Sequence, residues 1–142
     1  MKVVLQRVKS ASVHHEGKLI SSIGYGYALL VGFERDEPFE NLQWMVEKIL
    51  KIQLFDDWKN NIISKNFEIL VLSQFTLFAK FKGKRPDFHY AESHEKAKEL
   101  FNELIKLFKI KYSDEKIKSG LFGKQLLISL ENDGPNTILL EK

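Results

Sequence analysis

The chain has 142 residues, with 22 basic and 19 acidic side chains, a formal net charge of +3 and no cysteine. A chain of this length can bury a hydrophobic core as one domain, residues 1–142; the lack of cysteine excludes disulfides and thiolate zinc sites, and the mild positive charge permits an anionic partner without requiring one. The first residues lack the apolar core of a signal peptide and no apolar run approaches about 18 residues, so we expect a cytoplasmic protein with no membrane segment.

Short strands dominate the first quarter of the predicted structure. Residues 2–8 and 10–15 are expected to form two strands, and residues 19–23 a third. Residues 27–33 are a continuous apolar run, which is typical of a central strand. Because turn residues separate neighbouring runs, we expect a β-meander.

The middle of the chain predicts a helix followed by strands. A helix should begin at Pro38, because apolar residues then recur at helical spacing, at Phe39, Leu42, Val46, Ile49 and Leu50. Residues 53–55 look like a short strand and residues 56–61 like a polar loop. Residues 67–78 are expected to form the central strand of the sheet.

The last part of the chain predicts a second helix between a basic loop and further strands. Residues 79–90 form the basic and aromatic loop, and Ser93 is a plausible N-cap for a helix. The helix carries a regular apolar stripe that we assign to the core: Ala97, Leu100, Phe101, Leu104, Ile105 and Phe108. Residues 117–123 predict a short strand and turn, and residues 126–130 and 138–141 predict two strands.

A turn is expected between these last two strands, at residues 132–137, because Asn, Asp and Gly tolerate unusual backbone angles and Pro fixes its own φ. The elements together indicate an α/β fold with mixed or antiparallel sheets and two packed helices.

Three polar residues interrupt the strand predicted at residues 67–78, namely Ser73, Gln74 and Thr76. A polar group without a partner in such a run costs about 1–3 kcal/mol. The partner is either a ligand or a neighbouring turn, and spacing alone leaves both open. Ser73 and Thr76 are three positions apart, which places them on opposite faces of an ideal strand. A bend after Ser73 would bring them together.

The composition excludes several enzyme classes. The chain has no cysteine nucleophile, His-Glu-x-x-His motif, phosphate-binding glycine loop or nucleophile elbow. His14 and His15 are adjacent and would point to opposite faces of a strand, and His89 lies in the basic loop. Because no base lies within local reach of Ser73 or Thr76, an activated hydroxyl nucleophile is unsupported. Backbone N–H groups near Gln74 and Phe75, helped by the side chains of Ser73 and Thr76, could instead stabilise an oxyanion at an attacked carbonyl.

Two segments resemble a known family. Ser73-Gln74-Phe75-Thr76-Leu77 and Asn132-Asp133-Gly134-Pro135-Asn136-Thr137 are similar to the two signature motifs of D-aminoacyl-tRNA deacylases, which remove D-amino acids wrongly esterified to tRNA. Further similarity lies at residues 6–8, 11–13, 23–24, 85–88 and 120–123, so the likeness spans essentially the whole chain. The two motifs, in this order and about sixty residues apart in a chain of this length, are strongly specific.

The resemblance implies a compact, barrel-like, three-layer α/β domain that forms a homodimer. In such a dimer the Gly134-Pro135 bond is cis and reaches into the partner's active site. There it acts as a chirality filter that rejects L-amino acids, and Arg7 holds it in place. Asn132 and Thr137 of the same motif belong to the substrate-binding set.

The resemblance also implies that Ser73, Gln74, Phe75 and Thr76 surround the ester and the terminal adenosine of tRNA. Phe122 and Gly123 would lie near the adenine. The expected reaction is hydrolysis of D-aminoacyl-tRNA, and of glycyl-tRNA as well, by water with assistance from the terminal 2′-hydroxyl. Such proofreading needs no cofactor and no metal ion.

Departures from the family pattern are confined to a few positions. Lys124, Gln125 and Leu126 stand where the family usually has Ala-Asp-Met, and Asp87 replaces a serine. Phe75 places the chain with the D-specific branch, since a related group with altered chiral selectivity carries Met there. Two other readings remain: a non-catalytic domain that binds RNA or protein on this scaffold, and a hydrolase of small-molecule esters.

Overall fold

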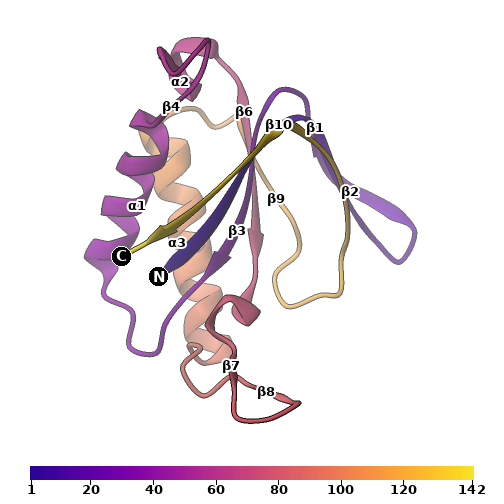
Figure 1. The fold of residues 1–142 in the computed structure, drawn as a ribbon, viewed down its shortest axis with the longest axis vertical. Helices are drawn as coiled ribbons and strands as arrows, with labels where there is room; N and C mark the ends of the chain where they lie inside the picture. The colour runs from indigo at the N-terminus through magenta and orange to yellow at the C-terminus, as the bar shows by residue number, and fades with distance from the viewer.

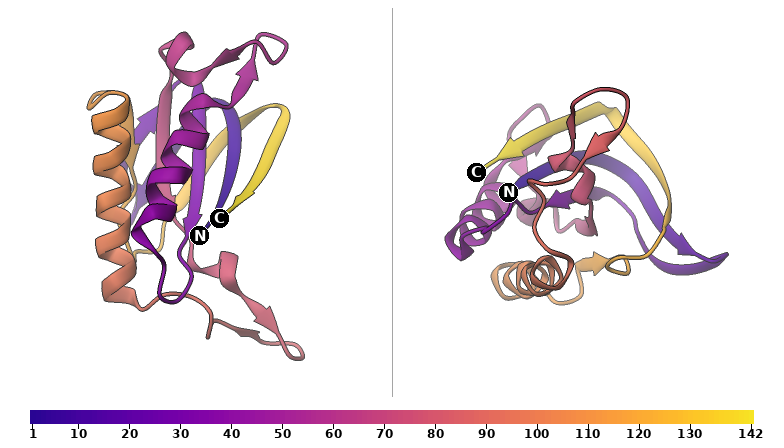
Figure 2. Two further views of the ribbon diagram at one scale, coloured as in Figure 1. Left: turned by 90° about the vertical axis from the view of Figure 1, so that its left-hand side faces the viewer. Right: turned by 90° about the horizontal axis from the view of Figure 1, so that it is seen from below.

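A six-stranded mixed sheet forms the centre of the protein in a computed structural model that covers residues 1–142 (Figure 1). The strands follow the order β10-β1-β3-β6-β9, and β2 also pairs with β1. Two long helices, α1 (Phe39–Lys51) and α3 (His94–Lys111), lie side by side next to this sheet (Figure 2). The expected mixed α/β fold with two packed helices is therefore confirmed. Neither helix is long and apolar enough to cross a membrane.

One strand, β1 (Lys2–His15), holds the first half of the sheet together. The prediction of two separate strands was wrong, because irregularities near Arg7 and Lys9 shift the pairing without ending the strand. Along one edge β1 pairs first with β3 (Gly26–Gly32) and then with β2 (Lys18–Ile23). The expected β-meander is therefore wrong as well, since β3 pairs with β1 and not with β2.

The pair β3 and β6 (Glu68–Ser73) is buried on both faces. The two strands are parallel, and β9 (Ile117–Ser119) continues the parallel pairing beyond β6. Alternate side chains of β3 and β6 pack against the helices, where they join the largest hydrophobic cluster: Tyr27, Leu29, Val31, Ile69 and Val71. The residues between them face a second cluster, formed with β1 and β2: Ala28, Leu70, Leu72, Val8, Ala11, Val13 and Ile23. The sheet thus curls over its own second face, which gives the expected barrel-like shape.

The helices begin and pack largely as predicted. Pro38 is the residue before α1, and the buried face of α1 consists of Leu42, Met45, Val46, Ile49 and Leu50. Ser93 holds the N-cap position of α3, but its side chain makes no capping hydrogen bond. The predicted stripe of α3 supplies the buried residues Leu100, Phe101, Leu104 and Phe108.

Three connections differ from the prediction. The expected strand at residues 67–78 ends at Ser73, and a 3-10 turn, η1 (Phe75–Phe78), follows it. The segment after β4 (Gln53–Phe55) forms the short strand β5 (Asn60–Asn61) and the one-turn helix α2 (Ile62–Lys65). The basic loop contains a small hairpin, β7 (Lys80–Phe81) and β8 (Pro86–Asp87), which projects from the molecule (Figure 1).

The end of the chain is one strand and not two. β10 (Leu127–Glu141) pairs with β1 from His14 back to Lys2, and residues 132–137 do not reverse its direction. The register shows why: Asn132 lies opposite Val8 and Thr137 opposite Gln6, so four residues of β10, 133–136, face the single residue Arg7. The predicted turn is a wide bulge in a continuous edge strand.

A buried ion pair fastens the start of β1. The Met1 ammonium lies 2.8 Å from Oε1 of Glu37 and donates to the Lys142 carbonyl at 2.6 Å. The other carboxylate oxygen of Glu37 accepts the Glu34 N–H at 2.8 Å, and both partners of the ion pair are almost fully buried. Glu37 therefore connects the two chain ends to the loop before α1.

We expect Glu37→Ala to lower the free energy of unfolding by about 3–5 kcal/mol, because it leaves the buried ammonium without a counter-charge. Urea denaturation of the untagged protein measures the change. Glu103→Ala is a matched control: it removes an exposed pair with Lys106 at 2.7 Å, for which we expect a loss below about 1 kcal/mol. Equal losses in the two variants would contradict this account of Glu37.

Candidate functional site

A pocket of about 640 Å³ lies beside the carboxyl end of β6. Ser73, Gln74 and Phe75 line it from β6 and the start of η1. Phe122 and Gly123 line it from the loop after β9. The structure therefore brings together five of the predicted site residues that are far apart in the sequence. Carboxyl ends of parallel strands are a common place for ligand sites in α/β folds.

Aromatic rings form two walls of this pocket. Phe75 and Phe88 meet edge to face with ring centroids 4.8 Å apart, and 57% of the Phe75 side chain is exposed. The ring centroid of Phe122 lies 5.2 Å from that of His94 and 5.6 Å from that of Phe101. Rings with free faces beside a pocket can stack on a nucleobase. The prediction did not include Phe88 or His94, because only the folded chain brings them next to residues 75 and 122.

The end of β6 leaves two backbone donors free. The Gln74 N–H donates to the Val31 carbonyl at 2.7 Å, so it is already used. The next two N–H groups, of Phe75 and Thr76, begin η1 and have no hydrogen-bond partner, as expected for the first residues of a helix. The predicted donors near Gln74 and Phe75 are thus shifted by one residue along the chain. Adjacent free N–H groups are the usual components of an oxyanion hole.

The hydroxyl groups at this strand end differ in their surroundings. Thr76 follows Phe75 in η1 but is not among the residues that line the pocket, and its Oγ1 accepts a hydrogen bond from Nε2 of Gln74 at 2.5 Å. Ser73 is half-buried in the pocket wall, and its hydroxyl makes no hydrogen bond within the chain. A neighbouring turn therefore does not satisfy Ser73, whereas Thr76 finds its partner two residues away.

The second predicted motif builds a corner on β10. The Gly134-Pro135 peptide bond is cis, and Gly134 has a φ of 134°, which favours glycine. The side chain of Asn132 makes three hydrogen bonds around this corner. Its Oδ1 accepts the Asn136 N–H at 2.7 Å. Its Nδ2 donates to Gln6 Oε1 and to Thr137 Oγ1, both at 3.0 Å. The side chains of Asn132 and Thr137 are therefore engaged in holding the corner.

Arg7 ties the corner to the rest of the protein. Its Nε donates to the Asp133 carbonyl at 3.1 Å, and its Nη1 donates to the Leu54 carbonyl. A Cβ atom on Gly134 would lie 3.4 Å from Nη2 of Arg7, so the guanidinium sits directly against the corner. Arg7 was predicted to hold Gly134 and Pro135 in place, and it lies where it could do so.

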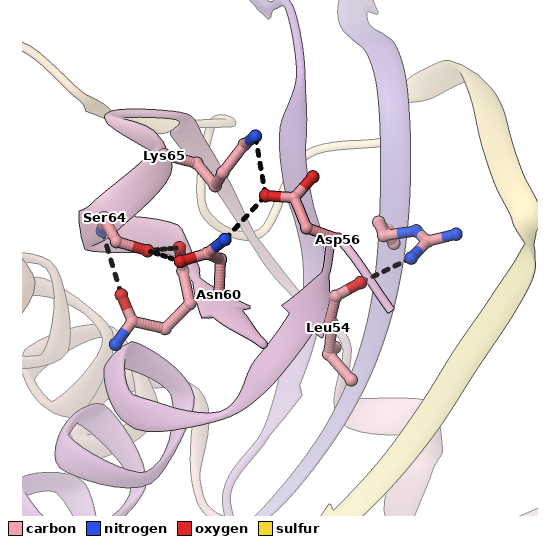
Figure 3. Close-up of polar contacts among 7 residues, drawn as sticks. Leu54, Asp56, Asn60, Ser64 and Lys65 are labelled. Carbon is pink, nitrogen blue, oxygen red and sulfur yellow. Dashed lines mark hydrogen bonds and ion pairs between the residues drawn. The ribbon is translucent and has the colours of Figure 1, made fainter. Parts of the chain in front are cut away.

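The loop after Leu54 is itself fixed by polar contacts (Figure 3). Asp56 accepts hydrogen bonds from Lys65 Nζ at 2.8 Å and from Asn60 Nδ2 at 2.7 Å. The Lys65 hydrogen bond, with that of Asn60, holds the pKa of Asp56 below its usual value. Asn61 caps the start of α2, because its Oδ1 accepts a hydrogen bond from the Ser64 N–H at 2.9 Å. This network places the Leu54 carbonyl that Arg7 contacts.

Tyr27, which lies opposite Arg7 in the pairing of β1 with β3, is fully buried. Tyr27 stacks on Phe55 at 5.3 Å, and its hydroxyl is the one buried side-chain polar atom without a hydrogen-bond partner. Burial raises the pKa of Tyr27, against a smaller opposite effect of the Arg7 charge. From the sequence, Tyr27 was predicted only as part of an apolar strand, because no local pattern marks its buried hydroxyl.

The pocket and the corner lie in different parts of one chain. Residues 133–136 face Arg7, which aligns with Tyr27 of β3 and then with Ile69 of β6. Ser73 is four residues further along β6. In a flat sheet, three strand spacings of about 4.8 Å and four residues of about 3.3 Å would separate the two by on the order of 20 Å. None of residues 132–137 lines the pocket of its own chain.

Comparison with known proteins gives one consistent result. The family model described as D-Tyr-tRNA(Tyr) deacylase matches residues 4–141. A D-aminoacyl-tRNA deacylase of Saccharomyces cerevisiae is 46% identical, with 99% of this chain and 98% of the relative covered. One of Drosophila melanogaster is 41% identical, over 99% of this chain and 92% of the relative.

A solved structure has the same fold. It is described as the c-Myc DNA unwinding element binding protein, is 41% identical and superposes with a TM-score of 0.96 over 100% of this chain and 99% of its own. The family match covers nearly the whole chain, and it includes both the pocket and the corner. The chain belongs to the D-Tyr-tRNA(Tyr) deacylase family.

Proposed function

We propose that this protein hydrolyses the ester bond of D-aminoacyl-tRNA and releases the free D-amino acid and tRNA. Family membership supports this reaction, and one observation in the structure carries it. The backbone N–H groups of Phe75 and Thr76 begin η1 without a hydrogen-bond partner, and Phe75 lines an aromatic-walled pocket. Such a site can polarise an ester carbonyl next to a bound nucleoside without any ionisable side chain.

The reaction needs only modest activation, because an aminoacyl ester is already reactive and correct placement lowers the barrier further. The carbonyl oxygen accepts the N–H groups of Phe75 and Thr76 while water attacks the carbonyl carbon. The negative charge of the tetrahedral intermediate then develops on that oxygen. When the intermediate collapses, the C–O bond to the ribose breaks, and the proton that the attacking water gives up reaches the departing 3′-oxygen through the neighbouring 2′-hydroxyl of the terminal adenosine.

In this proposal, backbone atoms at the corner discriminate between D- and L-amino acids. The corner at Gly134 and Pro135 presents backbone atoms and a proline ring, and it excludes the side chain of an L-residue by steric clash. A D-residue directs its side chain away from the corner, so its chemistry is not read. Glycine has no side chain to exclude, and we therefore expect glycyl-tRNA to be hydrolysed as well.

A second copy of the chain is needed to bring the corner to the pocket. The corner does not line the pocket of its own chain, and β10, which carries the corner, is an edge strand of the sheet. Leucines on β10 are unusually exposed for an isolated strand: 70% at Leu127, 38% at Leu130 and 60% at Leu139. A homodimer that covers this edge would bury them and place each corner in the partner's pocket.

The β7–β8 hairpin is the proposed contact for the tRNA acceptor stem. Its exposed residues include Lys80, Lys82, Lys84 and Arg85, with Phe81 67% exposed among them. Basic side chains interleaved with an exposed ring suit a nucleic-acid backbone. The hairpin follows η1 directly, so an RNA bound to it would lead toward the pocket.

The central test compares the release of D- and L-tyrosine from matched charged tRNAs. We expect the D-ester to be hydrolysed and the L-ester to remain, because only the L side chain meets the corner. Glycyl-tRNA should be hydrolysed too. Equal rates for D and L would remove the chirality filter, and inactivity on all three would favour the non-catalytic binding domain. Free D-tyrosine esters, added as competitors, test the alternative hypothesis of a hydrolase of small-molecule esters, because only such an enzyme should bind them in preference to charged tRNA.

We expect Thr76→Ala to reduce kcat for D-tyrosyl-tRNA by less than about tenfold, because both free N–H groups remain after the change. Removal of a true oxyanion donor costs roughly 10²–10³ in kcat. Ser73→Ala is the matched comparison, and thermal unfolding checks that both variants fold. A thousandfold loss in Thr76→Ala would transfer the stabilising role from the backbone to the hydroxyl.

Mixing two inactive variants tests the shared site. Gln125→Trp should fill the pocket, and Gly134→Val should distort the corner, so each homodimer should be inactive. After unfolding and refolding together, half of the dimers are mixed, and each has one intact pair of pocket and corner. We therefore expect recovery of about a quarter of the wild-type rate. A mixture as inactive as its components, with dimers confirmed by light scattering, would place both parts of the site in one chain.

A further inference from the structure

The pocket has a single uncommitted cation. Of its eighteen lining residues, Lys124 and Glu92 carry full charges. Glu92 is already satisfied: its two oxygens accept the Ser93 N–H at 2.7 Å and the Asp36 N–H at 2.9 Å, and Lys96 Nζ lies 3.3 Å away. Lys124, in contrast, forms no ion pair and no side-chain hydrogen bond, and it is exposed at the pocket. The net charge available to a ligand is therefore positive.

The backbone next to Lys124 is held firmly. Gly123 has a φ of 68°, and a Cβ atom on it would lie only 2.6 Å from Nε2 of His94. The turn thus presses against the first residue of α3, and Phe122 packs on His94 and Phe101. Lys124 extends from this fixed turn two residues after Phe122, the ring that we assign to the adenine. In the proposed complex, a cation in that position would lie next to the nucleoside.

The substrate carries its nearest negative charge on the same nucleoside. In tRNA the terminal adenosine is joined to the preceding nucleotide by one phosphodiester on its 5′ oxygen. We propose that Lys124 binds this phosphodiester and so anchors the terminal adenosine in the pocket. A charge-assisted hydrogen bond to phosphate is the contact that a free lysine ammonium makes best. This assignment rests on the proposed function and adds a residue that positions the substrate.

The test compares two small esters that differ only in this charge: 3′-D-tyrosyl-adenosine and the same ester of adenosine 5′-methyl phosphate. Lys124→Met should raise KM for the phosphorylated ester about tenfold more than KM for the nucleoside ester. The values of kcat for the two esters should change equally, since the phosphate lies away from the reacting bond. Rates are corrected for spontaneous hydrolysis, and D-tyrosyl-tRNA should follow the phosphorylated ester.

Two further variants sharpen the result. Lys124→Arg keeps the charge and should restore the wild-type preference for the phosphorylated ester. Lys98→Met removes an exposed lysine of α3 that has no ion pair and lies outside the pocket, and it should leave both KM values unchanged. Equal changes of KM for the two esters in Lys124→Met would overturn the assignment. A wild-type protein inactive on both esters and on D-tyrosyl-tRNA would instead overturn the proposed function itself.

Discussion

The hydrogen bond from the Gln74 N–H to the Val31 carbonyl fixes where the sheet ends and where the pocket begins. Up to this bond, β3 and β6 are paired and buried on both faces, and β6 pairs with β3 along its whole length. Directly after it the chain turns into η1, and the N–H groups of Phe75 and Thr76 have no hydrogen-bond partner. The free donors therefore follow from the change from β6 to η1, and their position is set by where β6 ends.

A second constraint concerns the bulge of β10 opposite Arg7. Four residues of β10 cannot pair with one residue of β1, so their backbone groups need other partners. Asn132 and Arg7 supply two of these partners, and Nη1 of Arg7 also donates to the Leu54 carbonyl in β4. A chain segment without regular pairing is thereby held in one conformation. The proposed site combines the free N–H groups after β6 of one subunit with the corner on β10 of the other.

The sequence predicted the elements that have a clear period and missed those that depend on partners. Helices α1 and α3 were predicted because their apolar residues recur at helical spacing, and the ends of β2 and β3 because turn residues flank them. The continuity of β1 and β10 was not predictable, because a bulge and a turn use the same residue types. For the same reason the Asn132 motif looked like a reversal of the chain. His94 and Phe88 joined the pocket only through tertiary packing, which leaves no local signal.

Because the proposed donors and the proposed filter are both backbone, the side chains that matter most are those that shape the backbone. Asn132 spans the bulge from Gln6 to Asn136 and so shapes the corner. This side chain does not need to touch the substrate in order to be required. A site of this kind reads the handedness and the ester of its substrate but not the identity of the amino acid. Recognition of the RNA must then come from side chains elsewhere, and the free charge of Lys124 and the basic hairpin are placed to provide it.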